Sequence, residues 1–242
     1  MSTALSERLA ALKKLAGSGN TAADIGCDHG YLSMALVESG AYCRVIACDL
    51  REGPLSAARE HIAAAGLNGQ IECRQADGLN ALAPGEADTI ILAGMGGALM
   101  IRILRAGEKA ARRADRLVLQ PQSEVGEFRK WLRENGYGIL EEEMIAEDGK
   151  YYPMMAVRPG AETDTEEAKI PEELADAYGA KLLNGKHPVL KRFLEEAGIM
   201  NLQILQHLKA QQADTPAKET RQKARIVELE KEKQRITEAL GL

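Results

Sequence analysis

The sequence predicts an α/β fold: a parallel, doubly wound sheet with helices on both faces, followed by a C-terminal helical hairpin. Two observations lead to this prediction. Short β-rich runs alternate with helical stretches along the first part of the chain, which is typical of parallel strands joined by crossover helices. Beyond Arg158 the chain becomes polar and contains proline, and two apolar stripes follow. We therefore expect one domain over 1–158, and a linker with a helical hairpin over 159–242.

The elements of the first domain follow in order along the chain. A helix over 4–16 would place Leu5, Leu9 and Leu12 on one face. Pro54 suits a first helical turn, and Gly66 suits the end of the same helix. The predicted strands are 21–25, 44–49, 71–75, 89–93 and 116–120, and the helices between or after them are 32–40, 53–66 and 123–136.

The last two β-rich runs, 137–146 and 151–159, have no helix between them. Asp148-Gly149 lies at their junction, and this dipeptide favours a tight hairpin turn. These runs are therefore expected to close the sheet as an antiparallel hairpin.

The C-terminal tail carries two apolar stripes that repeat at alternating spacings of four and three, a pattern typical of coiled-coil packing. Thr215 is expected to cap the second helix and Pro216 to begin it. The stripes are Leu190, Leu194, Ala197, Asn201, Ile204 and Leu208 in the first helix, and Ile226, Leu229, Lys233, Ile236 and Leu240 in the second.

The composition restricts the class of protein. Hydrophobic residues make up 45% of the chain and charged residues 28%, as in an ordinary globular protein. No signal peptide is recognisable and no apolar run approaches about 18 residues, so we expect a cytoplasmic protein without a membrane partner. The four cysteines show neither C-x-x-C pairs nor zinc-type spacing with histidine, so we expect free thiols and no metal. The net charge of −5 argues mildly against nucleic acid, although a local basic patch can still bind it.

The stretch ADIGCDHGYLS at 23–33 lies where a doubly wound sheet binds its cofactor, at the turn after the first strand. Gly26 and Gly30 allow a tight turn and a close approach of the backbone to a ligand. A dinucleotide-binding loop needs an unobstructed helix N-terminus for the pyrophosphate, but Asp28 occupies this position. Because a carboxylate repels pyrophosphate, NAD and FAD are disfavoured.

S-adenosylmethionine carries no phosphate, and its sulfonium, ammonium and ribose hydroxyl groups suit acidic neighbours. Asp49 ends the second strand, where a carboxylate can bind both ribose hydroxyls. Asp77 follows the third strand and can accept from the adenine amino group. A single Asp at a strand end is more often a helix cap or a turn residue. Asp24, Asp49 and Asp77 at the ends of three successive strands together favour S-adenosylmethionine. The expected cofactor-binding residues are Asp24, Gly26, Cys27, Gly30, Asp49, Leu50, Asp77, Gly78, Ala93, Gly94 and Met95.

The turn resembles the Rossmann-like methyltransferase signature [DE]-x-G-x-G-x-G, with a departure at Asp28. Together with AGMGG at 93–97, LVLQPQ at 117–122 and EDGKYYPMMAV at 147–157, the chain resembles the bacterial tRNA (adenine-22-N1)-methyltransferase (TrmK) family over nearly its whole length. The resemblance implies a Rossmann-like fold, S-adenosylmethionine as cofactor, and methylation of N1 of adenine 22 in tRNA.

The AGMGG stretch stands where many exocyclic-amine methyltransferases carry [ND]-P-P-[YFW]. N1 of adenine has an in-plane lone pair that can attack directly, so the enzyme mainly needs to align the reactants. Gly96 and Gly97 would let a base edge approach, or they would only permit tight packing. Methylation leaves a cationic adenine, so a nearby carboxylate would help. Asp28 is the first catalytic candidate and His29 the second, with helix capping as the alternative role of His29.

Several further residues are candidates for contact with tRNA, each with a plainer alternative. The resemblance implies that Arg8 borders the mouth of the site, where it would meet an RNA phosphate or the target base. The alternative is a solvated arginine without such a role. Tyr31 stacks on a base or packs beneath the loop, and the amides of Gln120 and Gln122 would read a base edge. Lys150, Tyr151 and Tyr152 would border the same mouth. Arg102, Arg105, Lys109 and Arg112 would form one basic stripe on a helix after Gly97, as a phosphate track or as a solvated face.

Two other functions remain open at this point. The chain can be a methyltransferase for a small molecule or protein, or a non-catalytic RNA- or protein-binding module on the same fold. The hairpin would grip tRNA, pack on the first domain or mediate self-association. Monomer and weak dimer are both compatible with the sequence.

Overall fold

The computed structural model describes residues 5–161, 169–211 and 215–242. The chain divides into two compact units, Met1–Thr165 and Glu166–Leu242. The predicted domain boundary follows Arg158, and the part of the predicted linker at 162–168 lies outside the described residues. Ala4, the predicted start of the first helix, also lies outside them.

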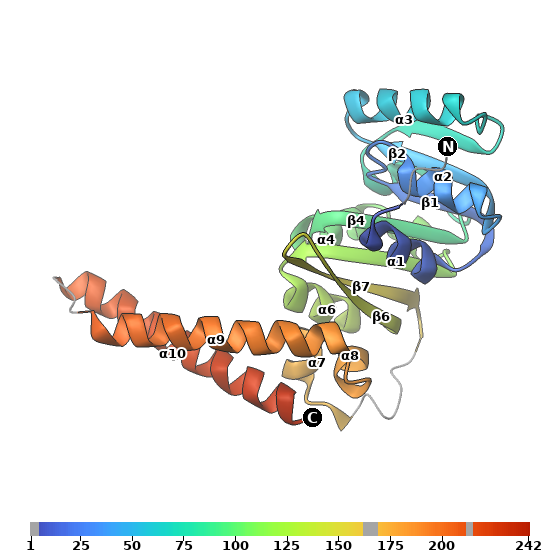
Figure 1. Cartoon of the computed structure of the whole chain (residues 1–242). Helices are drawn as coiled ribbons and strands as arrows, with labels where there is room; N and C mark the ends of the chain where they lie inside the picture. Colours follow the sequence, from blue (N-terminus) through green and yellow to red (C-terminus); the bar gives the residue numbers. More distant parts are fainter. Residues whose placement is uncertain (1–4, 162–168, 212–214) are drawn as a thin grey trace. The chain divides into compact units, whose positions relative to one another are not determined.

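Unit 1 is a seven-stranded sheet with the strand order β3-β2-β1-β4-β5-β7-β6 (Figure 1). The first five strands pair in parallel, while β7 is antiparallel to both of its neighbours. The strands are β1 (Gly19–Ile25), β2 (Tyr42–Asp49), β3 (Ile71–Gln75), β4 (Thr89–Gly96), β5 (Arg116–Ser123), β6 (Tyr137–Glu147) and β7 (Lys150–Pro159). The helices are α1 (Glu7–Ala16), α2 (Tyr31–Glu38), α3 (Glu52–Ala64), the short η1 (Gly78–Ala81), α4 (Gly97–Ala106), α5 (Glu108–Ala111) and α6 (Val125–Glu134).

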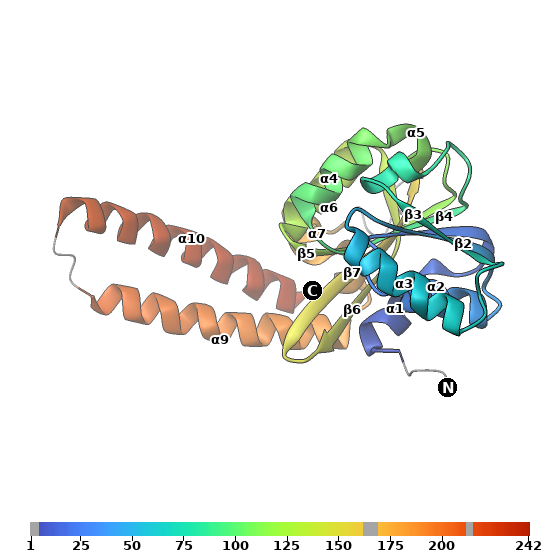
Figure 2. The ribbon, with the colours of Figure 1, turned by 90° about the horizontal axis from the view of Figure 1, so that it is seen from above.

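Both faces of the sheet are covered, which confirms the predicted fold class. In β4, Ile90 and Leu92 pack with α4, α5 and α6, while Ile91 packs on the opposite side with α1, α2 and α3. The view from above shows these helices on the two sides of the sheet (Figure 2). Because successive side chains of a strand point to opposite faces, strands buried on both faces read as continuous apolar runs.

The predicted closing hairpin is confirmed. β6 and β7 pair from Glu147 with Lys150 at the turn to Tyr137 with Pro159 at the far end. Asp148 and Gly149 both adopt the left-handed conformation, with φ of 50° and 71°. Two such residues match the right-handed twist of the strands, so the turn determines their register. β7 thereby lies between β5 and β6.

Unit 2 consists of helices α7 (Glu172–Tyr178), α8 (Ala180–Asn184), α9 (Pro188–Ala210) and α10 (Pro216–Gly241) among the residues described. α9 and α10 pack on each other as the predicted hairpin. The Thr215 side chain accepts a hydrogen bond from the Lys218 amide, which confirms the predicted cap. Across the hairpin, the Asn201 amide donates to the Leu229 carbonyl at 3.1 Å, and this buried polar contact favours one register.

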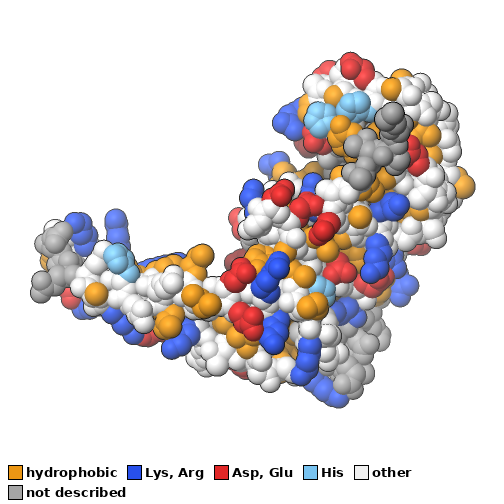
Figure 3. Space-filling model, viewed as in Figure 1, with side chains coloured by type: hydrophobic (Ala, Val, Ile, Leu, Met, Phe, Trp, Pro, Cys, Tyr) orange, Lys and Arg blue, Asp and Glu red, His pale blue; other side chains and the backbone are white. Residues whose placement is uncertain are grey.

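The predicted stripes are wrong at three positions, Ile204, Lys233 and Leu240, which are exposed. Leu205 is buried where Ile204 was expected, and Ala239 is buried where Leu240 was expected. In α9 the shift from Ile204 to Leu205 follows the drift of a helix of 3.6 residues per turn against a strict 3.5-residue repeat. Hydrophobic side chains show between the charged ones on the hairpin surface (Figure 3).

No helix among the described residues is long and apolar enough to cross a membrane.

Candidate active site

A cavity of about 600 Å³ lies at the carboxyl ends of β1, β2 and β4. This volume is in the range of small-molecule sites, and the position is where doubly wound sheets bind ligands. Most of the predicted site residues line it: Arg8, Asp24, Gly26, Cys27, Asp28, His29, Tyr31, Asp49, Leu50, Asp77, Gly78, Ala93, Gly94, Met95, Arg102 and Gln122.

The β1–α2 turn brings the backbone close to the cavity. The amides of Gly26 and Cys27 donate to the Cys48 carbonyl at 2.7 and 2.9 Å, so the turn is held against β2. Gly26 has φ of 79°, and a Cβ there would lie 2.5 Å from the Met95 methyl carbon. A side chain at this position would therefore strain the turn and displace the Met95 side chain.

Gly30 is the one predicted cofactor-binding residue that does not line the cavity. It precedes α2 with φ of 77°, and a Cβ would lie 3.2 Å from the Ala58 Cβ on α3. The structure thus gives Gly30 a role in the turn and in the packing of α2 on α3.

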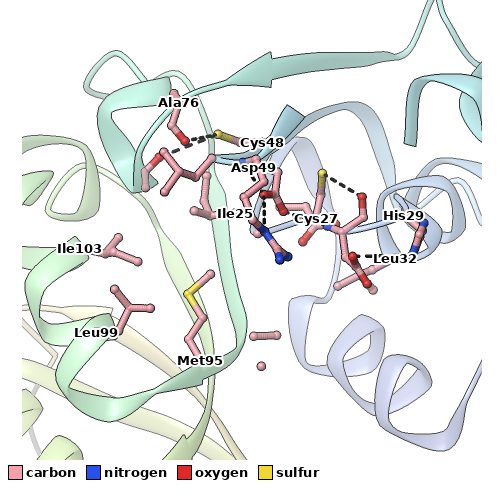
Figure 4. Close-up of a pocket in the computed structure, with 18 of the residues that line it drawn as sticks. Ile25, Cys27, His29, Leu32, Cys48, Asp49, Ala76, Met95, Leu99 and Ile103 are labelled. Atoms are coloured by element: carbon pink, nitrogen blue, oxygen red, sulfur yellow. Dashed lines mark hydrogen bonds and ion pairs between the residues drawn. The ribbon is translucent and has the colours of Figure 1, made fainter. Parts of the chain in front are cut away.

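Asp49 lies centrally in the cavity wall (Figure 4). Its carboxylate accepts hydrogen bonds from the Arg51 amide at 2.9 Å and from the Asp28 amide at 3.4 Å. Only 7% of Asp49 is exposed, whereas the adjacent Leu50 is 60% exposed. The end of β2 therefore offers a fixed carboxylate beside an open apolar surface, while Asp77 lines the cavity after β3.

Asp24 is a second buried carboxyl group in the wall. It accepts a hydrogen bond from Ser33 Oγ at 2.7 Å. Burial, together with the negative charges of Asp49 and Asp28, raises the pKa of Asp24 to about 6. A cationic ligand would relieve this repulsion, so the cavity is suited to positive charge.

Apolar side chains of β4 and α4 form the opposite wall. Met95, Leu99 and Ile103 lie together on this side, and Cys27, His29 and Leu32 lie on the other (Figure 4). Leu99 and Ile103 of α4 are not among the predicted site residues, although they are four residues apart and share a helix face. The lining is completed by further residues outside the prediction, namely Leu9, Ile25, Leu32, Cys48, Arg51 and Ala76.

Gln120 lies behind the wall and is fully buried. Its Oε1 accepts from the Gly94 amide at 3.1 Å and from Arg8 Nη1 at 3.5 Å, while its Nε2 donates to the Pro121 carbonyl at 3.1 Å. With its amide used in this way, Gln120 supports Gly94 and Arg8, which line the cavity, instead of reading a base edge.

Arg8 is held at the cavity by contacts from several strands. Besides Gln120 of β5, its amide donates to Glu147 Oε1 at 3.3 Å, and its guanidinium lies 5.6 Å from the ring centroid of Tyr152. A cation anchored in this way is well placed to meet an anionic ligand at the mouth of the cavity.

Gly96, Gly97 and Arg105 lie outside the cavity lining. A Cβ on Gly97 would lie 2.9 Å from the Ser123 carbonyl oxygen, and one on Gly96 would lie 2.9 Å from Ser123 Oγ. Gly96 and Gly97 therefore permit tight packing against Ser123, which is the second of the two roles predicted for them. Arg105 lies over the Trp131 ring at 5.7 Å.

The predicted stripe of four basic residues on one helix is wrong. α4 ends at Ala106, and Gly107 separates it from α5. A Cβ at Gly107 would lie 2.2 Å from the Leu79 Cβ, so only glycine, a weak helix former, fits at this position. Arg112 follows α5, donates to the Asn135 carbonyl at 2.7 Å and lies 4.4 Å from the Tyr137 ring centroid. Arg102 alone of the four lines the cavity.

The described residues hold no group of three or more His, Cys, Asp or Glu side chains that could bind a metal ion.

The comparisons with known proteins agree with this geometry. A family model described as "Methyltransferase domain" matches residues 5–155. The Bacillus subtilis tRNA (adenine(22)-N(1))-methyltransferase is 35% identical over 212 residues, which cover 87% of this chain and 88% of that protein. The chain belongs to the tRNA (adenine(22)-N(1))-methyltransferase family.

Solved structures of this methyltransferase family match both units of the chain. The crystal structure of B. subtilis TrmK has a TM-score of 0.85 at 32% identity, with 98% of this chain and 99% of that chain covered. A putative tRNA (m1A22) methyltransferase of Streptococcus pneumoniae, solved in complex with S-adenosyl-L-methionine, has a TM-score of 0.82 at 28% identity over 98% of this chain and 100% of that chain. The helical hairpin is therefore part of the family architecture.

Proposed function

We propose that the protein transfers a methyl group from S-adenosylmethionine to N1 of adenine 22 in tRNA. The observation that carries this proposal is the match over 87% of the chain to a tRNA (adenine(22)-N(1))-methyltransferase, in a chain with a cavity suited to a cationic cofactor. The proposal includes action in the cytoplasm as a monomer or weak dimer. Catalysis is assigned to 1–158, and the hairpin within 159–242 is assigned to tRNA contact.

The residues of the cavity fit S-adenosylmethionine, which supplies the methyl group when bound. The fixed carboxylate of Asp49 is suited to accept from both ribose hydroxyls, and exposed Leu50 offers an apolar surface to the purine. Asp77 would accept from the adenine amino group. Asp24 and the turn at Gly26 form the part of the cavity with buried negative charge, where an ammonium group is favoured.

The target adenine needs orientation more than activation, because its N1 lone pair lies in the ring plane. Met95 and Tyr31 line the cavity and are suited to hold a flat base. Asp28 is the exposed carboxylate of the β1–α2 turn, with His29 Nε2 3.8 Å from its Oδ1. As N1 becomes methylated the adenine gains positive charge, which the Asp28 carboxylate would stabilise. Arg8 and Arg102 would contact the phosphates.

The raised pKa of Asp24 predicts a pH dependence of cofactor binding. Below about pH 6 Asp24 is protonated in the free protein, and a cationic ligand favours its ionised form. Affinity for S-adenosylmethionine is therefore expected to fall by about tenfold for each pH unit below this pKa. Calorimetry at pH 5 and pH 7.5 measures the fall. Asp24→Asn keeps a hydrogen-bond acceptor for Ser33, and its affinity for S-adenosylmethionine should no longer depend on pH in this range. An equal pH dependence in the variant and the wild type would contradict the assignment to Asp24.

Incubation with labelled S-adenosylmethionine and unmodified tRNA tests the proposed function. We expect one methyl group per tRNA, on adenine 22, mapped by mass spectrometry and by a block to reverse transcription at that base. A transcript with guanine at position 22 is the control and should stay unlabelled. Labelling of a small molecule or protein in place of tRNA would favour another substrate class, and absence of cofactor binding would favour a non-catalytic module.

A further inference from the structure

Three rings cluster beside the cavity, where α2 begins and α3 ends. His29 and Tyr31 line the cavity, while His61, in the last turn of α3, does not. The Tyr31 and His61 rings are stacked, with centroids 5.2 Å apart and planes 24° apart. His29 lies 6.0 Å from each of them in a tilted arrangement. Neither the sequence motifs nor the cofactor site explains why His61 is part of this cluster.

A hydrogen bond holds His61 in place. Its Nδ1 lies 3.0 Å from the His29 carbonyl oxygen, and since a carbonyl only accepts, Nδ1 carries the hydrogen and donates it. The bond joins α3 to the β1–α2 turn, which also contains Asp28. His61 therefore has two separate contacts with the cavity wall: a hydrogen bond to the turn and a stacked ring against Tyr31.

Tyr31 is unusual in this chain because it is an exposed aromatic residue at a cavity. Only 4% of the sequence is aromatic. Among the described residues, Tyr31 is the one aromatic side chain among the exposed large hydrophobic ones, with 41% of its surface accessible. His61 covers part of the ring, and the remaining surface borders the cavity. A flat apolar surface backed by a second ring is suited to another flat ring.

We propose that His61 is a positioning residue that holds Tyr31 as a stacking surface for a nucleobase of the RNA substrate. The inference rests on the proposed function, since it takes the ligand to be RNA. Bases that leave a helix stack on aromatic and histidine side chains, and a target base inside paired RNA must be unstacked before it reacts. The ring contact of His61 fixes the Tyr31 plane before RNA arrives, which lowers the ordering cost of binding.

Two substitutions separate the contacts of His61. His61→Asn keeps an N–H near the position of Nδ1 and removes the ring, while His61→Phe keeps the ring and removes the donor. We expect His61→Asn to raise KM for tRNA about fivefold, as expected for loss of an aromatic pair, and His61→Phe to stay within about twofold of wild type. Affinity for S-adenosylmethionine, measured by calorimetry, should change less than about twofold in both, since His61 lies outside the cofactor cavity. Glu60→Ala, an exposed neighbour on α3, is the control and should behave as wild type.

A normal KM for tRNA in His61→Asn, or an equal rise in both variants, would overturn the stacking role. If KM for tRNA rises in His61→Phe but stays normal in His61→Asn, the hydrogen bond and not the ring carries the effect. That result would also overturn the stacking role. Binding of tRNA in the presence of S-adenosylhomocysteine provides the same comparison without turnover. If wild-type protein binds tRNA but methylates none, the proposed function fails, while the binding comparison still tests His61.

Discussion

Asp49→Ala is expected to weaken S-adenosylmethionine binding by at least about 100-fold, because two charged hydrogen bonds to the ribose are worth about 3 kcal/mol or more together. The carboxylate is nearly buried and already oriented by the Arg51 and Asp28 amides, so it binds the hydroxyls without further ordering. Calorimetry with the purified variant measures the loss.

Asp115→Ala is the matched control for this variant. Asp115 is exposed and immediately precedes β5, so it lies at the amino end of that strand, whereas the cavity lies at the carboxyl ends of the parallel strands. Circular dichroism should show that both variants are folded. An Asp49→Ala protein that binds the cofactor as wild type does would contradict the assignment of the ribose to the end of β2.

Asp28→Asn is expected to lower kcat for tRNA about 100-fold while cofactor affinity stays within about threefold, because the charge acts on the methylated base and not on the cofactor. Asparagine is the suitable replacement, since Asp28 has φ of 50° and Asn tolerates this left-handed conformation. Single-turnover methylation of tRNA at saturating cofactor measures the chemical step.

Asp148→Asn provides the same substitution in the same backbone conformation, with φ of 50°, outside the cavity lining. It should leave kcat unchanged. If Asp28→Asn also leaves the single-turnover rate unchanged, Asp28 shapes the turn and has no part in catalysis. The reaction would then depend on alignment of N1 alone.

The sheet could be predicted from the sequence because its signals are local. Apolar runs such as 89–93 and the Asp148-Gly149 turn specify strands and a hairpin without knowledge of their partners. The acids at the ends of β1, β2 and β3 follow from the same argument, since parallel strands bring their carboxyl ends to one edge. They line one cavity in the structure.

Two of the errors arose where a distant contact decides the outcome. Leu79, far earlier in the chain, leaves no room for a side chain at position 107, so glycine, a weak helix former, stands where α4 ends. The sequence pattern predicts Gln120 as a polar residue at a strand end, open to a ligand. In the structure its buried side-chain amide accepts hydrogen bonds from Gly94 and Arg8. Neither partner is visible in a local window, since both come from other elements.

The position of β7 has a consequence for how the chain is made. β7 pairs with β5 on one side and β6 on the other, so β5 keeps an open edge until residue 159 has been synthesised. Arg8 and Gln120 likewise meet only after more than a hundred residues have left the ribosome. Such long-range pairing is slow to form, and an unpaired strand edge invites aggregation. A nascent chain that stalls within β6 would therefore depend on chaperones, and Arg8 would gain its contacts with Glu147 and Tyr152 only after the last strand is inserted.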